Sequence, residues 1–235
     1  MSNLHPAFQQ ASLLQGLEEE ARRTIASAFR AFHYDEGTTL FLEGEPARVF
    51  YLIGEGRVKV LQTSPEGHQV ILHMLGPGQL VGALPTLEEG NYPATAVTME
   101  KSLLFSIAAK DFEAILEEYP QVTRNLLRFA TQKLHETHAK LREMATERVE
   151  QRIARLLCRL VGQVGVAVED GILLDLPLTR QDLAEMTGTT LYTVSRTLKN
   201  WERRGLLRSQ RTRVIIINQH ALALLAEDLA ADAVS

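Results

Sequence analysis

The sequence has a single cysteine, Cys158, among its 235 residues. One thiol cannot form an internal disulfide, a four-cysteine zinc site or an iron–sulfur cluster. No apolar run approaches the length of a membrane-spanning helix, and Met1 to Gln10 has neither the basic lead nor the apolar stretch of a signal peptide. The sequence therefore predicts a folded, soluble protein of the cytoplasm without a membrane partner.

Most of the chain lacks net positive charge, and its formal net charge is −4. The exception is the segment from Ser195 to Arg213, which contains seven Lys or Arg and one acidic residue and so carries +6. The remainder of the chain carries −10. Basic charge confined to one segment favours a local contact with a polyanion.

Short apolar runs separated by glycines fill the stretch from about Thr38 to Ile107. Their spacing of roughly 8–12 residues is typical of an antiparallel sandwich or barrel. We therefore predict an N-terminal β-roll, preceded by a short helix from Glu18 to Phe32. The apolar runs are TLFLE, RVFYLI, GRVKVLQ, HQVILHML, ATAVTM and SLLFSI.

A long helix is predicted from Asp111 to about Ala145, with Pro120 inside it. Apolar side chains recur along it at alternating steps of three and four residues, which suits pairing with a second copy of the chain. The alternative, that this stripe packs on the chain's own β-roll, stays open. The predicted dimer seam consists of Leu127, Ala130, Leu134, Thr137, Leu141 and Met144.

Two further helices joined by a glycine turn are predicted after a helix from Glu147 to Val161 and the strand GILLDL. Thr179 and Asp182 have the spacing of a capping box and open the first, from Arg180 to Met186. Thr187-Gly188-Thr189 ends it, and the second runs from about Thr190 to Arg204. Such a pair is a helix-turn-helix, whose second helix can enter a DNA major groove.

The second helix of this pair has one apolar and one polar face. Val194, Leu198 and Trp201 follow one another at i, i+4 and i+7, so they are expected to be buried. The segment LLRSQRTRVIIIN after the helix predicts a β-hairpin, or wing, with Arg208, Arg211 and Arg213 near its turn. Arginine can bond guanine O6 and N7 together or bind a phosphate, so both elements point to DNA.

Two segments resemble the CRP/FNR family of transcription regulators. TRQDLAEMTGTTLYTVSRTLKNWERRGLL resembles their winged helix-turn-helix, and YLIGEGRVKVLQTSPEGHQVILHMLGPGQLVG resembles their effector-binding β-roll. The likeness runs from about Leu13 to Asn218. It implies an α+β fold with a β-roll domain (residues 1–110), a dimerisation helix (111–145) and a winged helix-turn-helix domain (146–235). It also implies a homodimer that binds an inverted repeat of double-stranded DNA, with RNA polymerase as a partner.

The resemblance assigns individual DNA contacts. Ser195 and Arg196 match base-reading positions, with Arg196 expected to contact a guanine, and the start of the first helix matches phosphate-contacting positions. Tyr192 stands where the family commonly has Glu, which can accept from cytosine N4, so the half-site sequence stays open. The predicted DNA contacts are Thr179, Arg180, Gln181, Thr190, Leu191, Tyr192, Ser195, Arg196, Lys199, Arg211 and Arg213.

The effector site departs further from the family. Members that bind cyclic AMP use a Glu for the ribose and an Arg-Ser pair for the phosphate, whereas this chain has Ala83, Pro93 and Ala94 at those positions. Pro93 has no backbone N–H and no cation remains there, so cyclic AMP sensing in the usual manner is not expected. An apolar pocket is predicted instead, formed by Gly82, Ala83, Leu84, Tyr92, Pro93, Ala94, Thr95, Leu127, Thr137 and His138.

Two possibilities stay open for that pocket. The loop GNYPATA resembles the corresponding loop of the haem-dependent, nitric-oxide-sensing branch, so haem is one candidate, and the absence of any required ligand is the other. Haem would need an axial ligand. The candidates are His33, His68, His73, Met74, His135 and His138.

Enzymatic function is not predicted. His68 and His73 fall on opposite faces of one predicted strand and so cannot share a cupin-type metal ion. The run from His135 to His138 has one residue fewer between its histidines than the zinc-protease motif. Neither a Gly-Lys-Ser/Thr phosphate loop nor a Gly-x-Ser-x-Gly motif occurs. The alternative function is a ligand-binding regulatory module that controls a protein partner through its C-terminal domain.

Overall fold

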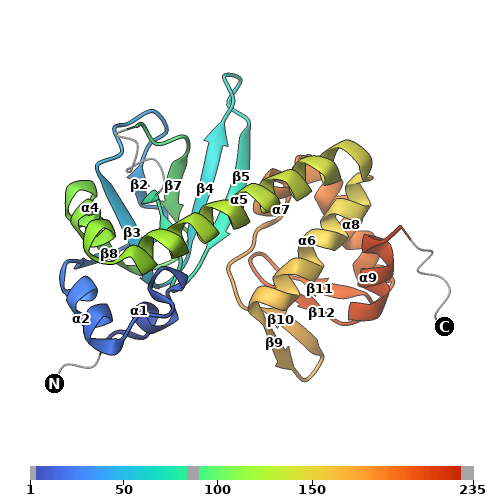
Figure 1. Cartoon of the computed structure of the whole chain (residues 1–235). Helices are drawn as coiled ribbons and strands as arrows, with labels where there is room; N and C mark the ends of the chain where they lie inside the picture. The colour runs from blue at the N-terminus through green and yellow to red at the C-terminus, as the bar shows by residue number, and fades with distance from the viewer. Residues whose placement is uncertain (1–3, 84–89, 229–235) are drawn as a thin grey trace. The chain divides into compact units, whose positions relative to one another are not determined.

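The computed structural model describes residues 4–83 and 90–228. The chain divides into two units, Met1–Glu136 and Thr137–Ser235. The boundary lies inside one helix, α5 (Pro120–Thr146), drawn in green to yellow in Figure 1. Among the described residues, no helix combines the length and the apolar character needed to cross a bilayer.

The first unit contains two four-stranded antiparallel sheets, with strand orders β1-β8-β3-β6 and β2-β7-β4-β5. Both sheets contribute to one apolar cluster, in which Phe41, Ile53, Val58 and Leu104 are buried. The predicted β-roll is thereby confirmed, and each of the six apolar runs forms a strand. The strands are β1 (Arg30–Tyr34), β2 (Thr39–Phe41), β3 (Val49–Glu55), β4 (Val58–Thr63), β5 (Gln69–Leu75), β6 (Leu80–Val81), β7 (Thr95–Thr98) and β8 (Ser102–Ala108).

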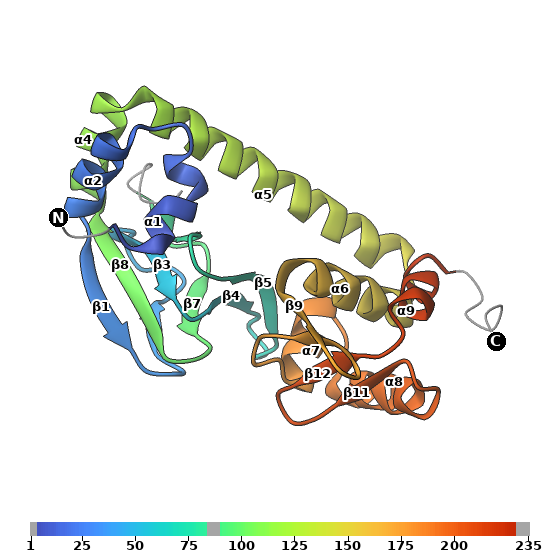
Figure 2. The ribbon, with the colours of Figure 1, turned by 90° about the horizontal axis from the view of Figure 1, so that it is seen from below.

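Helices cover the other face of the β1-β8-β3-β6 sheet, as Figure 2 shows. In β3, Phe50 and Leu52 point into this helical layer and Tyr51 points into the opposite cluster, as the two-residue period of a strand requires. Val122 and Leu126 anchor the start of α5 in the same layer. The other helices are α1 (Pro6–Gln10), the 3₁₀ turn η1 (Ser12–Leu14), α2 (Glu19–Ser27) and α4 (Ala109–Glu118).

Two helix predictions for this unit are wrong in their bounds. The helix predicted from Glu18 to Phe32 ends at Ser27, and β1 begins at Arg30. The side chains of β1 are mostly exposed, so no alternating apolar pattern marks it as a strand. The single helix predicted from 111 to 145 is two helices, because a residue before proline is disfavoured in the α region and Tyr119 leaves the helix before Pro120.

The second unit is the winged helix-turn-helix. A four-stranded sheet of order β11-β12-β10-β9 lies beside its helices. The helix predicted to end at Gly162 continues through it and is capped by Gly165, and the strand that follows was not predicted. The elements are α6 (Val149–Val164), β9 (Gly165–Val168), β10 (Gly171–Leu174), α7 (Arg180–Thr187), α8 (Leu191–Arg203), β11 (Leu207–Ser209), β12 (Val214–Ile216) and α9 (Gln219–Ala226).

Candidate nucleic-acid interface

The turn between α7 and α8 is set by local hydrogen bonds and one glycine. Thr179 Oγ1 accepts from the Asp182 N–H at 3.0 Å, and Asp182 Oδ2 accepts from the Thr179 N–H at 3.0 Å, which completes the predicted capping box. Gly188 ends α7 with φ 62° and ψ 45°, in the left-handed region. A Cβ atom there would also lie 2.9 Å from Met144 Cε. The left-handed backbone therefore favours glycine at this turn, whereas the exposed, flexible end of Met144 can move aside.

Helix α8 buries one face and exposes the other, as predicted. Val194, Leu198 and Trp201 are fully buried, and Trp201 Nε1 donates to Glu150 Oε1 at 2.8 Å, which ties α8 to α6. On the opposite face, the Tyr192 side chain is 74% exposed. Leu191, Arg196 and Lys199 are exposed beside it, Ser195 is half-buried, and Thr190 caps the helix. This face is available to a groove of duplex DNA.

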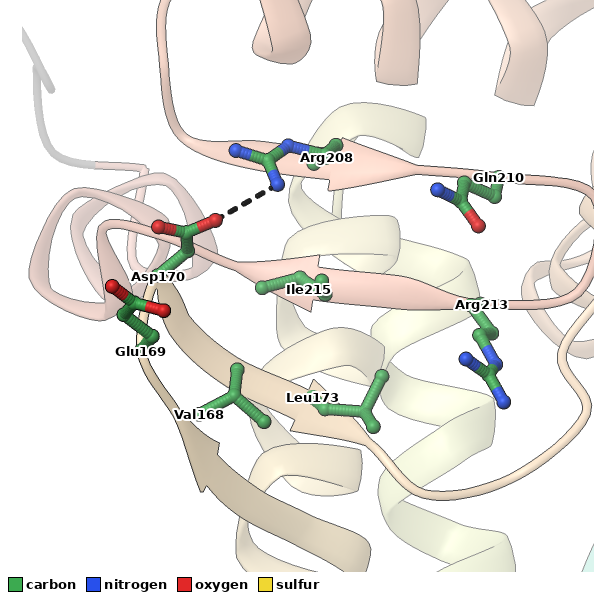
Figure 3. Close-up of a pocket in the computed structure, with 8 residues that line it drawn as sticks. All are labelled: Val168, Glu169, Asp170, Leu173, Arg208, Gln210, Arg213 and Ile215. Atoms are coloured by element: carbon green, nitrogen blue, oxygen red, sulfur yellow. Dashed lines mark hydrogen bonds and ion pairs between the residues drawn. The ribbon is translucent and has the colours of Figure 1, made fainter.

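The wing consists of β11, β12 and a four-residue turn closed by a hydrogen bond from the Gln210 N–H to the Arg213 carbonyl, at 2.8 Å. Arg211 and Arg213 are exposed at this turn. Arg208 differs, because its Nη1 lies 2.9 Å from Asp170 Oδ2, as Figure 3 shows. The structure thus leaves Arg211 and Arg213 as the exposed cations of the wing turn and pairs Arg208 with a carboxylate.

The start of α7 is connected to the wing through one hydroxyl group. Arg180 Nη2 donates to Ser209 Oγ at 3.1 Å. Glu202 Oε1, near the end of α8, accepts from both the N–H of Ser209, at 2.9 Å, and its Oγ, at 2.6 Å. The Ser209 hydroxyl therefore donates to Glu202 and accepts from Arg180 at the same time. Glu202 and Ser209 were not among the predicted site residues, because the contact depends on the hairpin geometry.

Other predicted contact residues at the start of α7 also have partners within the chain. Gln181 is exposed, and its Nε2 donates to Glu185 Oε1 at 2.8 Å. The Thr179 hydroxyl is engaged in the capping box. A phosphate at this helix start would therefore meet the exposed amide of Gln181 and the guanidinium of Arg180, while Thr179 acts on the helix itself.

Helix α5 exposes large apolar side chains at seven-residue spacing. Leu127 is 67% exposed, Leu134 52% and Leu141 67%, and Met144, three residues after Leu141, is exposed as well. Thr137 is exposed and Ala130 half-buried. Met144 also lies close to the turn between α7 and α8, where its methyl group is the atom that a side chain at Gly188 would meet. A row of exposed leucines on one helix is typical of a surface that is covered by a partner.

Comparison with known proteins finds two domain families in the chain. Residues 31–119 match the cyclic nucleotide-binding domain, and residues 151–225 match the Crp-like helix-turn-helix domain. Over 196 residues the chain is 30% identical to the cyclic AMP receptor protein of Thermus thermophilus, which covers 83% of this chain and 88% of that protein. The chain belongs to the CRP/FNR family of transcription regulators.

A second relative and a solved structure are also similar to most of this chain. The CRP-like cAMP-activated global transcriptional regulator of Mycobacterium tuberculosis is 26% identical over 213 residues, with 91% of this chain and 95% of that protein covered. The solved structure of the c-di-GMP-responsive global regulator CLP of Xanthomonas campestris has the same fold, with a TM-score of 0.75 at 21% identity over 85% of this chain and 99% of that chain. The prediction of a DNA-binding transcription regulator with no enzymatic role is confirmed by this membership.

The part of the predicted pocket around Tyr92 is filled by side chains of this CRP/FNR member itself. The Tyr92 ring stacks on Phe41 at a centroid distance of 3.7 Å, and its hydroxyl donates to the Val49 carbonyl. Burial raises the pKa of the Tyr92 hydroxyl, which keeps it a donor. A Cβ atom at Gly82, whose φ is +79°, would lie 3.0 Å from the Phe41 ring and 3.1 Å from the Tyr92 ring.

The remaining predicted pocket residues occupy different surroundings. Ala83 is buried in the helical layer, whereas Tyr92 is buried in the cluster between the sheets. Pro93 is exposed, and its carbonyl accepts from Gln62 Nε2 at 2.8 Å. Thr95 Oγ1 accepts from the Glu43 N–H at 3.0 Å. Ala94 is buried and Leu127, Thr137 and His138 are exposed, while Leu84 lies outside the described residues.

The candidate haem ligands lie on several different elements of the chain. His33, His68 and His135 are exposed, on β1, before β5 and on α5 respectively. His73 and Met74 are neighbours on β5, and Nδ1 of His73 lies 4.0 Å from Glu136 Oε2. Over residues 4–83 and 90–228, no three His, Cys, Asp or Glu side chains are arranged to hold a metal ion.

Burial raises the pKa of the Cys158 thiol, which disfavours the reactive thiolate.

A shallow cavity of about 280 Å³ lies on the outer face of the winged sheet (Figure 3). Val168, Leu173 and Ile215 form its apolar floor, with the Asp170–Arg208 pair at one end and Arg213 at the other. Cross-strand neighbours share a face of a sheet, and Leu173 pairs with Ile215 in the ladder. The opposite face of the same strands contains Leu207 and Ile216, both buried.

Proposed function

We propose that two copies of the chain pair along the seam of α5 and bind an inverted repeat of double-stranded DNA. The exposed leucines at positions 127, 134 and 141 support the pairing, because solvent-exposed leucines at seven-residue spacing are stabilised when a second helix covers them. A two-fold dimer places its recognition helices in major grooves about 34 Å apart. The inverted repeat follows from that symmetry.

The observation that carries this proposal is the exposed polar and basic face of α8, opposite its buried apolar face. On this face, Arg196 would bond guanine O6 and N7, with Ser195 and Lys199 beside it. Thr190, Leu191 and Tyr192 would enter the groove first, because recognition helices contact bases near their N-termini. Phosphates would be bound at the start of α7 and at the wing turn, through Arg180, Gln181, Arg211 and Arg213, while the Thr179 hydroxyl caps α7.

For the β-roll, we propose that DNA binding does not depend on cyclic AMP bound in the manner usual for the family. The side chains of Ala83 and Ala94 are buried methyl groups. Neither side chain can accept a hydrogen bond from a ribose hydroxyl or donate one to a phosphate. Pro93 offers only a carbonyl, and that carbonyl is bonded to Gln62. A cyclic phosphate would lose its hydration without a charged partner at these positions.

Haem is not part of this proposal. Ala83 and Tyr92 bury their side chains in two different clusters, so these two residues do not line a common flat cavity. The Tyr92 ring is held by Phe41 and by its bond to the Val49 carbonyl. A ring as large as haem would have to displace that packing. The proposal is therefore a regulator that binds DNA without an added ligand, acts in the cytoplasm and has RNA polymerase as its further partner.

The test is selection from a pool of random duplex DNA at near-physiological salt with purified protein and no added ligand. Enrichment of an inverted repeat whose centres lie about one helical turn apart is the expected result. Parallel selections with cyclic AMP, and with haem with and without nitric oxide, should recover the same repeat at the same yield. Salt-sensitive retention of any duplex without enrichment would contradict ligand independence, and no retention would favour the protein-partner alternative.

A further inference from the structure

Tyr192 exposes its aromatic ring on the recognition helix. The side chain is 74% exposed, the highest exposure among the large apolar and aromatic side chains of the described residues. The Arg196 guanidinium, one helical turn further along, lies over this ring at 6.0 Å from its centroid. Leu191, the preceding residue, is 48% exposed. The N-terminal end of α8 therefore presents an apolar surface directly beside its candidate guanine-reading arginine.

The major groove contains one apolar recognition feature, the 5-methyl group of thymine. The other base edges present hydrogen-bond donors and acceptors, which a carboxylate or an amide can match. A phenol ring has an apolar face that can cover a methyl group, and it lacks the charge that lets Glu accept from cytosine N4. The exposed ring of Tyr192 thus suits a thymine better than a cytosine.

We infer that Tyr192 recognises the 5-methyl group of a thymine close to the guanine that Arg196 contacts. This inference rests on the proposed function, since it requires α8 to lie in a major groove. Four residues of helix span about 6 Å, so the two contacts fall within about two base-pair steps of each other. The contact between the two side chains favours this position of the guanidinium before DNA binds.

The competing explanation is that the Tyr192 hydroxyl donates or accepts a hydrogen bond with a base or a phosphate. Tyr192→Phe separates the two, because it keeps the ring and removes only the hydroxyl. Tyr192→Ala removes both, and Tyr192→Glu restores the carboxylate found at this position in the family. Because the side chain is largely exposed, none of these substitutions disturbs a buried core.

The experiment uses the full chain and the site recovered by selection. Each thymine of one half-site, and its symmetry mate, is replaced by deoxyuridine, which lacks only the 5-methyl group, and dissociation constants are measured for the parent and the three variants. At one position near the guanine, deoxyuridine should weaken binding of the parent and of Tyr192→Phe by about fourfold for each methyl group, the value for exposing one methyl group. Tyr192→Ala should bind both duplexes equally, and Tyr192→Glu should prefer cytosine there.

Three results would contradict the inference. Equal binding of thymine and deoxyuridine by the parent at every position would show that no methyl group is recognised. Loss of the methyl effect in Tyr192→Phe would assign the contact to the hydroxyl. Retention of it in Tyr192→Ala would assign it to another side chain, Leu191 being the first to examine. If the parent selects no site at all, the proposed function itself fails, which is a distinguishable outcome.

Discussion

The guanidinium of Arg180 donates to the hydroxyl of Ser209, 29 residues later in the chain, at 3.1 Å. Glu202 holds that hydroxyl from the other side at 2.6 Å. The first helix of the helix-turn-helix, the end of the recognition helix and the wing therefore share one hydrogen-bond network. A side chain proposed to contact phosphate is thus positioned by a serine of the wing.

Ser209→Ala should weaken binding to the selected site by about 1 kcal/mol, the usual value of one hydrogen bond, because Arg180 loses the acceptor that orients it. The slope of log Kd against log salt concentration should become shallower in the same variant. Ser209→Thr keeps the hydroxyl and serves as the control. In an Arg180→Ala background, Ser209→Ala should have no further effect on binding, and an additive loss would show that the two residues act independently.

Leu134→Asp combined with Leu141→Asp should convert the dimer into monomers, because each charge would be buried in the proposed interface. Sedimentation analysis measures the change, and affinity for the inverted repeat should fall to that for a single half-site. Gln132→Asp, two residues from Leu134 and hence on the opposite face of α5, is the matched control. Monomers that bind the inverted repeat as tightly as the parent would refute the role of the seam.

Arg196→Ala and Arg211→Ala should have different effects on DNA binding. Loss of Arg196 should cost about 1–3 kcal/mol on the selected site and relax specificity at one base pair, as for a bidentate guanine contact. Loss of Arg211, at the exposed turn of the wing, should weaken binding to all sequences alike and reduce the salt slope by about one. Binding measured on the selected site and on each single-base variant distinguishes them. Identical behaviour of the two variants would contradict the division between base and phosphate contacts.

Gly188→Ala should destabilise the second unit by about 1–2 kcal/mol, since an L-residue is strained in the left-handed region. Adding Met144→Ala should recover the stability lost to the contact with Met144 Cε. The stability lost to backbone strain should remain lost. Gly162→Ala is the control, because Gly162 lies inside α6 with open space where a Cβ atom would be added. This substitution should be neutral or stabilising by up to about 1 kcal/mol. Urea unfolding measures all three, and equal effects of the two glycine variants would contradict the backbone argument.

The sequence predicted those helices and strands in which the spacing of apolar residues, the glycines and the capping residues match the pattern of buried side chains. The apolar runs of the β-roll are separated by glycines, and the capping box at Thr179 and the spacing of Val194, Leu198 and Trp201 define the helix-turn-helix. β1 was missed because four of its five residues are exposed, and β9 was missed because all four of its residues are exposed. In both cases the ladder of backbone hydrogen bonds, rather than an apolar pattern, makes the strand.

The candidate site was predicted unevenly for a similar reason. Residues of α8 could be assigned to faces because helical periodicity fixes where each side chain points. The links from Arg180 to Ser209 and from Arg208 to Asp170 join segments far apart in sequence, and only the folded hairpin brings them together. The surroundings of Ala83 and Tyr92 likewise depend on which sheet face each residue occupies, which the loop sequence does not specify.

The most direct test is native mass spectrometry of the full chain with two duplexes, one containing the selected inverted repeat and one with its second half-site scrambled. The proposed dimer predicts two chains on the intact repeat at protein concentrations where the scrambled duplex is mostly free. It also predicts that inserting five base pairs between the half-sites, which turns the second one to the opposite side of the helix, abolishes tight binding. One chain per duplex, or equal occupancy of both duplexes, would contradict it.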